Sequence, residues 1–295
     1  MILIVGCGNL GNYLIQHILL KTDEKILATV RDVQNAVSFP NVEYIKCDVS
    51  VNSDLDNLKN KIADNRVKVF YLAASHNIDY VYKKPDEARK VNIAGLECFL
   101  DKITDIDSLF YASTDCVYGE SKASDHIFNE GSEINPINEY GRQKAEAEKF
   151  ILNHGYNVVR FSLLFGPSLS GKKNFYDSVC EDLQSGKQTE MLDGMERQVI
   201  SYADAAKYMY ELSELDSEKL PSVVNVCGDK LYSKYDMGCV LADKLKVSKT
   251  LVNKVSEEQG RKLFSDKRAS SITMDNSLLK SLLSIEEVLW EETKC

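Results

Sequence analysis

Runs of aliphatic residues alternate with amphipathic segments through the first half of the chain. Residues 2–5 are an unbroken apolar run, which is typical of a strand buried on both faces of a parallel sheet. Similar strand-like runs occupy residues 26–30, 42–49, 67–74, 109–112 and 157–162. Between them, apolar residues recur at helical spacing over residues 13–19, 53–65, 86–103 and 139–148. This alternation predicts an α/β fold built on a doubly wound parallel sheet.

The alternation loosens beyond residue 165. Helical patterns then occupy residues 175–185, 203–215, 234–245 and 275–283, whereas residues 199–202 and 223–226 are strand-like. We expect residues 1–165, with returning segments near 199–228, to form the larger domain. Residues 166–295 are expected to form mainly a smaller C-terminal substrate-binding lobe. Because no linker or internal repeat divides the chain, the two parts should be intertwined.

Glycines fall at positions 6, 8 and 11, directly after the first strand. In a dinucleotide site, Gly6 permits the tight turn, Gly8 lets the backbone approach a pyrophosphate, and Gly11 lets the helix pack against the strand. With Asn9 and Leu10 they begin a helix, whose N-terminus favours negative charge. A purely structural glycine turn is the alternative. The order of strand, turn and helix favours a Rossmann-type NAD(P)-binding loop.

The end of the second strand bears on the choice of cofactor. Arg31 comes directly off that strand, and Asp32 follows it. An acidic residue at this place holds the ribose hydroxyls of NAD, whereas a basic residue favours the 2′-phosphate of NADP. Arg31 therefore favours NADP, with NAD as the alternative. The other interpretation of Arg31 is a solvated loop charge.

Two further strand ends supply candidate cofactor contacts. Asp48 and Val49 end the third strand, where they are placed to touch an adenine. Ala73 and Ala74 end the fourth strand, and their small side chains let a ligand lie against the backbone. These four residues extend the predicted cofactor site along the edge of the sheet.

Polar residues follow the fourth strand at the mouth of the expected cleft. Ser75 and His76 are candidate substrate contacts, although a lone histidine is also common as a solvated loop residue. Asn92 lies within the next predicted helix, where its side-chain amide could brace the neighbouring strand.

Hydroxyl groups and a lysine mark the candidate catalytic residues. Ser113, Thr114 and Asp115 end the fifth strand, where parallel sheets bind ligands, although Ser and Thr also begin ordinary turns. Tyr140 and Lys144 are one helical turn apart and therefore share a helix face. As an isolated pair they would be read as an exposed aromatic and a solvated lysine. Their place after a dinucleotide loop and a hydroxyl-bearing strand favours catalysis instead.

Composition narrows the classes of partner. The formal net charge of −9 argues against nucleic-acid binding, which needs clustered Lys and Arg. No apolar run approaches the roughly 20 residues that span a bilayer, so no membrane partner is expected. The chain starts on a strand and not on a secretory signal, so a cytoplasmic setting is expected.

The eight cysteines are scattered singly, without Cys-x-x-Cys motifs or nearby histidine pairs. We interpret most of them as small buried hydrophobic residues in a reducing compartment, and we expect no metal site.

Taken together, these residues resemble the extended short-chain dehydrogenase/reductase family, and within it the dTDP-4-dehydrorhamnose reductase-like group. The likeness spans nearly the whole chain, and Tyr140-x-x-x-Lys144 with its distance from Thr114 is its most specific part. It also includes Ala73-Ala74-Ser75-His76, Asn92, Arg160…Gly166-Pro167, Val199 to Ala206 and Val224 to Gly228. The resemblance also implies a sugar-nucleotide substrate and suggests a homodimer.

Two departures from the family pattern matter. The glycine loop is one residue shorter than the usual Gly-x-x-Gly-x-x-Gly, as in atypical members. Related 4,6-dehydratases carry Thr-Asp-Glu after the catalytic strand, whereas this chain has Thr114-Asp115-Cys116. Since the glutamate is missing, a dehydration reaction is disfavoured.

The resemblance implies an NAD(P)H-dependent reduction of a keto-sugar nucleotide. Tyr140 would protonate the carbonyl oxygen, Lys144 would lower the pKa of Tyr140 and bind the nicotinamide ribose, and Thr114 would fix the same oxygen. An NAD-dependent sugar-nucleotide epimerase would use the same three residues and regenerate its cofactor in each cycle. A non-catalytic, cofactor-binding regulatory subunit is the third alternative.

Overall fold

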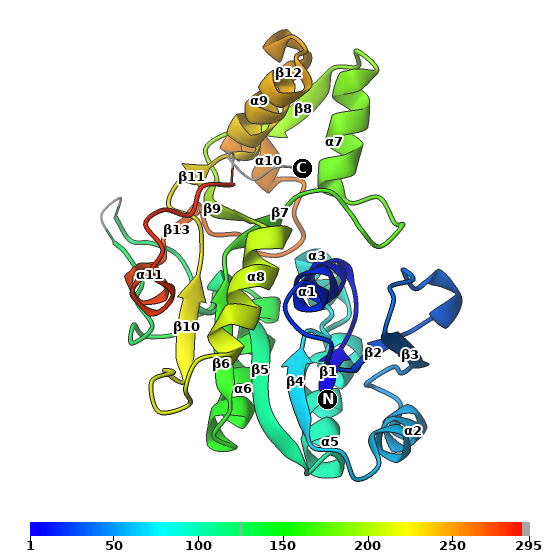
Figure 1. Ribbon diagram of the computed structural model, residues 1–295. Coiled ribbons are helices and arrows are strands. Elements are labelled where there is room, and N and C mark those ends of the chain that lie inside the picture. Colours follow the sequence, from blue (N-terminus) through cyan, green and yellow to red (C-terminus); the bar gives the residue numbers. More distant parts are fainter. Residues whose placement is uncertain (124–125, 291–295) are drawn as a thin grey trace.

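The computed structural model describes residues 1–123 and 126–290 of the chain. Its centre is a seven-stranded sheet in the order β10-β6-β5-β4-β1-β2-β3, and all neighbouring strands are parallel (Figure 1). The strands are β1 (Ile2–Val5), β2 (Ile26–Val30), β3 (Val42–Lys46), β4 (Val67–Tyr71), β5 (Ile106–Thr114), β6 (Asn157–Phe161) and β10 (Val223–Val226). The α/β fold with a Rossmann-type parallel sheet is therefore confirmed.

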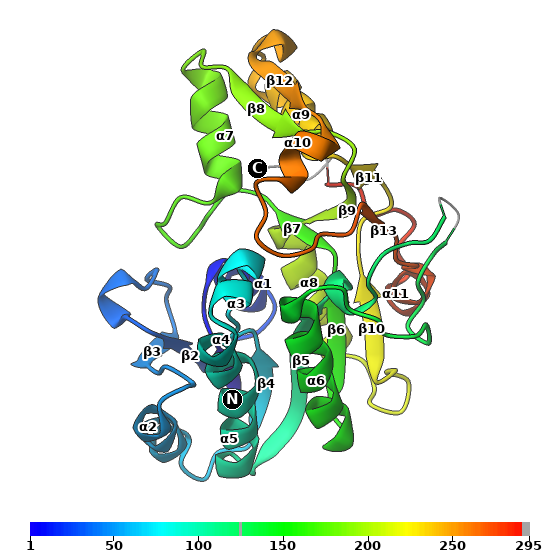
Figure 2. The same cartoon turned by 180° about the vertical axis from the view of Figure 1, so that it is seen from behind.

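Helices cover both faces of this sheet. One face carries α1 (Asn9–Leu19), α8 (Tyr202–Ser213) and α11 (Ser277–Leu283), which are seen in front of the sheet in Figure 1. The other face, turned toward the viewer in Figure 2, carries α2 (Asn52–Ile62), α3 (Ile78–Lys83), α4 (Pro85–Arg89), α5 (Gly95–Lys102) and α6 (Glu139–Asn153). Along β1, Ile2 and Ile4 pack into one core and Leu3 and Val5 into the other, which explains the unbroken apolar run.

The remaining elements form a smaller lobe above the carboxyl ends of the central strands (Figure 1). Its first sheet contains β7 (Leu163–Phe165), β9 (Glu196–Ser201), β11 (Leu231–Tyr232) and β13 (Ser271–Ile272). A second, two-stranded sheet pairs β8 (Thr189–Leu192) with β12 (Val252–Val255). The helices of this lobe are α7 (Phe175–Gln184), α9 (Lys234–Leu245) and α10 (Glu257–Arg261). Its own apolar core includes Phe165, Leu183, Leu241 and Trp290.

Several features differ from the predicted pattern. The expected helix over residues 86–103 is interrupted by a π-helical segment, Lys90–Ala94, between α4 and α5. The strands β8 and β12 were not predicted, because Thr189 to Leu192 and Val252 to Val255 are short and mix apolar with polar residues. Such runs carry no clear period of two or 3.6 residues.

The prediction for the cysteines is largely wrong. Cys47 and Cys227 are buried, but the other described cysteines are only half-buried: Cys7, Cys98, Cys116, Cys180 and Cys239. For Cys7, Cys98, Cys180 and Cys239 the reason is their position, because they lie at the margins of the cores and not within them. Cys295 lies outside the described residues.

Candidate active site

The glycine loop joins β1 to α1 and is shaped by close contacts. Gly6 has a φ of +86°, and a Cβ atom there would lie 2.5 Å from the Cα atom of Ala73. Around Gly8, by contrast, a Cβ atom would meet nothing within 4 Å. Gly11 packs near Cys7 and Ile4 of the strand. Gly6 therefore serves the turn, and the open space at Gly8 suits the approach of a ligand.

The N-terminus of α1 is open to a ligand. Gly8 is its N-cap residue and supplies no side-chain hydrogen bond, and the first turn contains no acidic residue. The Asn9 side chain instead binds the loop after β7: it donates to the Pro167 carbonyl at 3.3 Å and accepts from the Leu169 amide at 2.7 Å. Leu10 packs against the neighbouring apolar core. An uncapped helix N-terminus of this kind fits a pyrophosphate.

At the ends of β2 and β3, the two acidic side chains are engaged locally. Asp32 accepts a hydrogen bond from the Gln34 amide at 3.0 Å and so caps a short 3-10 turn. Arg31 is exposed beside it. The Asp48 carboxylate accepts from the Ser50 amide and hydroxyl, while Val49 is buried. Of the residues at the end of β2, Arg31 is thus the better placed to meet a ligand.

The segment after β4 is braced by Asn92. Its side-chain oxygen accepts from the Ser75 amide at 2.7 Å, and its nitrogen donates to the Ser75 carbonyl at 3.1 Å and to Gln143 at 3.0 Å. The predicted brace is confirmed, and it holds Ala73, Ala74 and Ser75 along the cleft. The π-helical segment carries Asn92 to this place.

His76 follows at the rim of the same cleft and is exposed. Desolvation lowers its pKa, and the positive charges of Lys144 and Arg31 act in the same direction, against a hydrogen bond with Ala74. His76 thus lies within electrostatic range of both a candidate catalytic residue and a candidate cofactor contact.

Thr114 and Tyr140 meet where β5 ends. Asn138 caps α6 by accepting from the Gly141 amide at 2.8 Å. A Cβ atom on Gly141 would lie 2.5 Å from the Cys116 carbonyl oxygen, so α6 packs closely on the turn after β5. This contact places the Tyr140 phenol beside the Thr114 side chain, close enough for Thr114 to influence its pKa. The structure therefore brings together two of the three predicted catalytic side chains.

The surroundings keep Tyr140 protonated. Burial raises the pKa of Tyr140, the neighbouring Cys116 and Asp115 add to this, and the Thr114 side chain opposes it. A phenol with a raised pKa is a proton donor at neutral pH.

Lys144 lies against β5. Its ammonium donates to the Tyr111 hydroxyl and to the Ala112 carbonyl, both at 2.6 Å. Burial lowers the pKa of Lys144 to about 7, against the negative charge of Glu148. Lys144 is not among the groups that shift the pKa of Tyr140. That part of its predicted role stays a prediction.

Ser113 and Asp115 are oriented by neighbours other than a substrate. The Ser113 hydroxyl donates to Glu148 of α6, on the face of the sheet opposite to Thr114, because alternate strand residues face opposite sides. Asp115 accepts from the Thr114 hydroxyl at 3.0 Å and lies 3.9 Å from the Nε atom of Arg197. Neither arrangement presents a group to the cleft as directly as Thr114 does.

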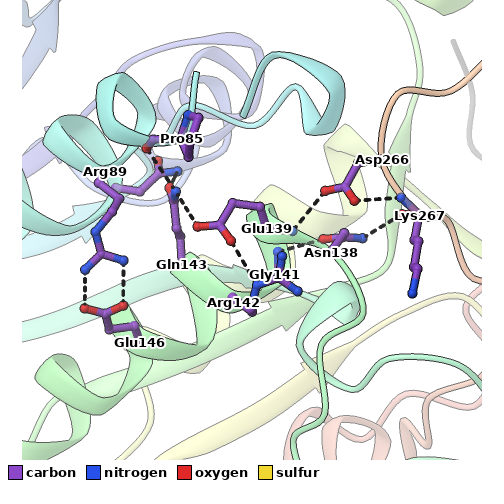
Figure 3. A network of polar contacts seen from close by, with 11 residues as sticks. Pro85, Arg89, Asn138, Glu139, Gly141, Arg142, Gln143, Glu146, Asp266 and Lys267 are labelled. Carbon is purple, nitrogen blue, oxygen red and sulfur yellow. Dashed lines mark hydrogen bonds and ion pairs between the residues drawn. The ribbon is translucent and has the colours of Figure 1, made fainter. Parts of the chain in front are cut away.

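A polar network at the start of α6 joins the sheet to the smaller lobe (Figure 3). Gln143 accepts from Asn92 and donates to Glu139 at 3.1 Å. The backbone amide of Glu139 donates to Asp266 at 3.0 Å, and the Asn138 side chain donates to the Lys267 carbonyl at 3.3 Å. Figure 3 shows how the contacts of Asn138 and Glu139 lead from the start of α6 to the segment that carries Asp266 and Lys267. The sequence does not signal the contacts of Asn92, Asp266 and Lys267 with α6, because each joins distant parts of the chain.

Within residues 1–123 and 126–290, no group of three or more His, Cys, Asp or Glu side chains is placed to hold a metal ion. In the same ranges, no helix has both the length and the apolar character needed to cross a membrane.

Comparison with protein families gives one match across the chain. A family model described as the RmlD substrate binding domain covers residues 1–294. The first curated relatives are each named methionine adenosyltransferase 2 subunit beta. The protein from Xenopus tropicalis is 24% identical over 196 residues, which are 64% of this chain and 58% of the relative. The protein from Danio rerio is 27% identical over 180 residues, 59% of this chain and 54% of the relative. The chain thus spans just over half the length of these two relatives.

A plant relative and several solved structures are also similar. A trifunctional UDP-glucose 4,6-dehydratase, 3,5-epimerase and UDP-4-keto-L-rhamnose reductase from Arabidopsis thaliana is 29% identical over 149 residues, 47% of this chain and 22% of the relative. UDP-glucuronic acid 4-epimerase from Bacillus cereus, solved with NAD, has a TM-score of 0.81 at 18% identity, covering 99% of this chain and 95% of its own. UDP-glucose 4-epimerase from Thermus thermophilus, also solved with NAD, has a TM-score of 0.81 at 15% identity, with 99% and 96% covered. At these identities the structures establish the shared fold.

Proposed function

Since the chain belongs to the family of the RmlD substrate binding domain, as its resemblance to the extended short-chain dehydrogenases/reductases predicted, we propose that it is an NAD(P)H-dependent reductase of a keto-sugar nucleotide. The observation that carries this proposal is the meeting of the Tyr140 phenol with the Thr114 side chain. It lies at the carboxyl end of a central parallel strand, where such sheets bind their ligands. The plant relative, whose name includes a keto-rhamnose reductase, supports the same class of substrate.

The residues present fit a dinucleotide. The open space at Gly8, the uncapped start of α1 and the small residues Ala73 and Ala74 would hold its pyrophosphate and ribose, with Val49 near the adenine. When bound there, a nicotinamide cofactor supplies the hydride for the reduction. The choice between NADP and NAD remains part of the proposal. Exposed Arg31 beside a locally engaged Asp32 supports NADP, whereas several solved relatives contain NAD.

Tyr140 acts as the proton donor in this mechanism. As the carbonyl carbon is reduced, negative charge develops on its oxygen and must be neutralised. Because Tyr140 stays protonated at neutral pH, it can donate that proton. The Thr114 hydroxyl holds the same oxygen in place. A raised phenol pKa suits this direction better than the base-catalysed oxidation that opens an epimerase cycle.

The test uses purified protein, NADPH or NADH, and a 4-keto-6-deoxy sugar linked to dTDP or UDP. We expect net cofactor oxidation, and a loss of at least a hundredfold in kcat for Tyr140→Phe with cofactor affinity retained. Tyr82→Phe, which removes an exposed hydroxyl, is the matched control. Unchanged turnover in Tyr140→Phe contradicts the mechanism. Sugar interconversion by co-purified NAD without net oxidation identifies an epimerase instead.

A second candidate function comes from the names of the curated relatives. Seven curated relatives, at 21% to 27% identity to this chain, are named methionine adenosyltransferase 2 subunit beta. On this basis the chain would be a regulatory subunit of a methionine adenosyltransferase. Size-exclusion chromatography of the chain mixed with the catalytic subunit from the same cell separates the two functions. A stable complex with an altered rate of adenosyl transfer, and no keto-sugar reduction, would favour the subunit.

A further inference from the structure

Two tyrosines stand side by side in the central sheet. Tyr71 of β4 and Tyr111 of β5 are register partners, and their ring centroids are 6.0 Å apart. Each is 1% exposed and belongs to the same apolar core. Their hydroxyl groups differ, however. The Tyr71 hydroxyl is buried without a hydrogen-bond partner, whereas the Tyr111 hydroxyl accepts from Lys144.

The Lys144 side chain is buried in contact with Tyr111. Lys144 is 1% exposed, and its Nζ atom lies 3.9 Å from the centroid of the Tyr111 ring. An ammonium group has three hydrogen-bond donors, and Tyr111 with the Ala112 carbonyl takes two of them. A buried ammonium is tolerated only where its donors find partners. Tyr111 supplies both an acceptor oxygen and a ring face.

We infer that Tyr111 is a positioning residue for Lys144: its hydroxyl and ring hold the ammonium in the floor of the cleft and stabilise the charged form. The catalytic consequence is that the remaining hydrogen-bond donor of Lys144 binds a hydroxyl group of the cofactor. Only this consequence rests on the proposed function. The placement itself stands on the contacts of Tyr111 and Ala112.

The groups that face Lys144 come from four elements. Glu148 on α6 favours the ammonium, although Arg160 of β6 is bonded to that carboxylate. His76, after β4, lies within electrostatic range, and Tyr140 is one turn away on α6. Burial raises the pKa of Tyr111 well above its usual value, so Tyr111 remains a neutral hydroxyl. A neutral hydroxyl can bond either form of Lys144, but the bond from an ammonium is the stronger.

The first experiment measures the pKa of Lys144 directly. Protein labelled with ¹³C at the lysine Cε atoms is titrated by NMR, and the Lys144 signal is assigned by its loss in Lys144→Met. We expect Tyr111→Phe to lower this pKa by about half to one unit, the difference between a charge-assisted and a neutral hydrogen bond. Tyr111→Leu, which also removes the ring, should lower it further. Tyr71→Phe, the matched control, should leave it unchanged. An unchanged pKa in Tyr111→Phe overturns the inference.

The second experiment measures the pH profile of turnover. If turnover requires the Lys144 ammonium, the alkaline limb of the pH profile should move to lower pH in Tyr111→Phe, by the same shift as the pKa of Lys144. Given a pKa of Lys144 of about 7 in the unaltered chain, the rate falls about three- to tenfold at pH 8 and stays near normal at pH 5.5. A merely structural loss would lower the rate equally at both pH values, which contradicts the inference. If the chain reduces no keto-sugar nucleotide, the proposed function fails while the NMR titration still decides the role of Tyr111.

Discussion

The two halves of the central sheet are held together differently. Around β1 to β3, the buried polar side chains are neutral: Asn12 accepts from the Cys7 thiol, and Thr29 accepts from the Gly6 amide at 2.8 Å. Around β5 and β6, four buried side chains carry charge, and these are the only ones in the described part of the chain: Asp115, Lys144, Glu148 and Arg160. The half that holds the proposed cofactor site, the cofactor half, thus depends on backbone shape, and the half that holds the candidate catalytic residues depends on paired charges.

In the half around β5 and β6, one group of hydrogen-bonded side chains connects several elements. Arg160 donates through Nε and Nη2 to both oxygens of Glu148, which also accepts from Ser113. Arg160 donates to the Tyr118 hydroxyl at 2.8 Å, and Tyr118 donates to Asn225 at 2.7 Å. The group therefore connects β5, β6, α6 and β10. Because a buried charge costs free energy when unpaired, we expect single changes here to be severe and changes elsewhere to be milder.

The largest effect is expected for Arg160→Met. It leaves the Glu148 carboxylate buried, at 1% exposed, without its countercharge. The free energy of unfolding should fall by about 3–5 kcal/mol, measured by chemical denaturation. Adding Glu148→Leu to that variant should restore much of the loss. If the single variant were as stable as the unaltered chain, the contrast between the halves would be wrong.

A smaller effect is expected for Gly6→Ala in the cofactor half. A side chain at a φ of +86°, against the backbone of Ala73, should lower the free energy of unfolding by about 1–3 kcal/mol. Gly8→Ala is the matched change, because its Cβ atom would meet no neighbour. We expect Gly8→Ala to keep the stability and to weaken NAD(P)H binding, measured by calorimetry. If Gly6→Ala and Gly8→Ala were equally stable, the backbone conformation at Gly6 would not be what stabilises this half of the sheet.

A pH-dependent effect is expected for Asp79→Asn, where the smaller lobe meets α3. Although burial raises the pKa of Asp79, the Ser265 amide and the Arg268 guanidinium outweigh it, so the pKa is lowered. The stabilisation is therefore present above the unfolded pKa of about 3.9 and is lost as the pH falls through the folded value. Thermal unfolding should show the variant about 1 kcal/mol less stable at pH 7. The two proteins should converge near pH 2, and a difference that persists there would rule out this cause.

The smallest effect is expected for Arg89→Met. Arg89 binds Glu146 of α6 through two nitrogens, as Arg160 binds Glu148, but both partners are about two-fifths exposed (Figure 3). Water screens such a pair, so the loss should be below about 1 kcal/mol in the same denaturation experiment. A loss as large as that of Arg160→Met would show that burial does not decide the cost.

The fold was predictable because its strands have a clear pattern. Residues 2–5 are apolar and fully buried, residues 67–71 are so except for Lys68, and the glycine loop follows the first of these strands. The meeting of Thr114 with Tyr140 followed from the family motif. Tyr111 was missed because its hydroxyl sits within an apolar run that looks like an ordinary buried strand.

The contacts of the smaller lobe were not predictable for a different reason. Asp266 reaches the start of α6 from 127 residues away in sequence, and no local period records such a pairing. The placement of Lys144 against Tyr111 depends likewise on how closely α6 packs on β5, which a helix pattern leaves open. Local sequence thus specifies elements, whereas contacts between distant segments require the coordinates.

The position of β10 also has a consequence for synthesis. This edge strand is Val223–Val226, but it pairs with β6, which ends at Phe161. While the ribosome is still adding the intervening residues, β6 has an unpaired edge, and Tyr118 lacks the Asn225 oxygen that later accepts from it. The nascent chain therefore completes its main sheet only after Val226 has been made. A chaperone that covers open strand edges would be most useful to it during that interval.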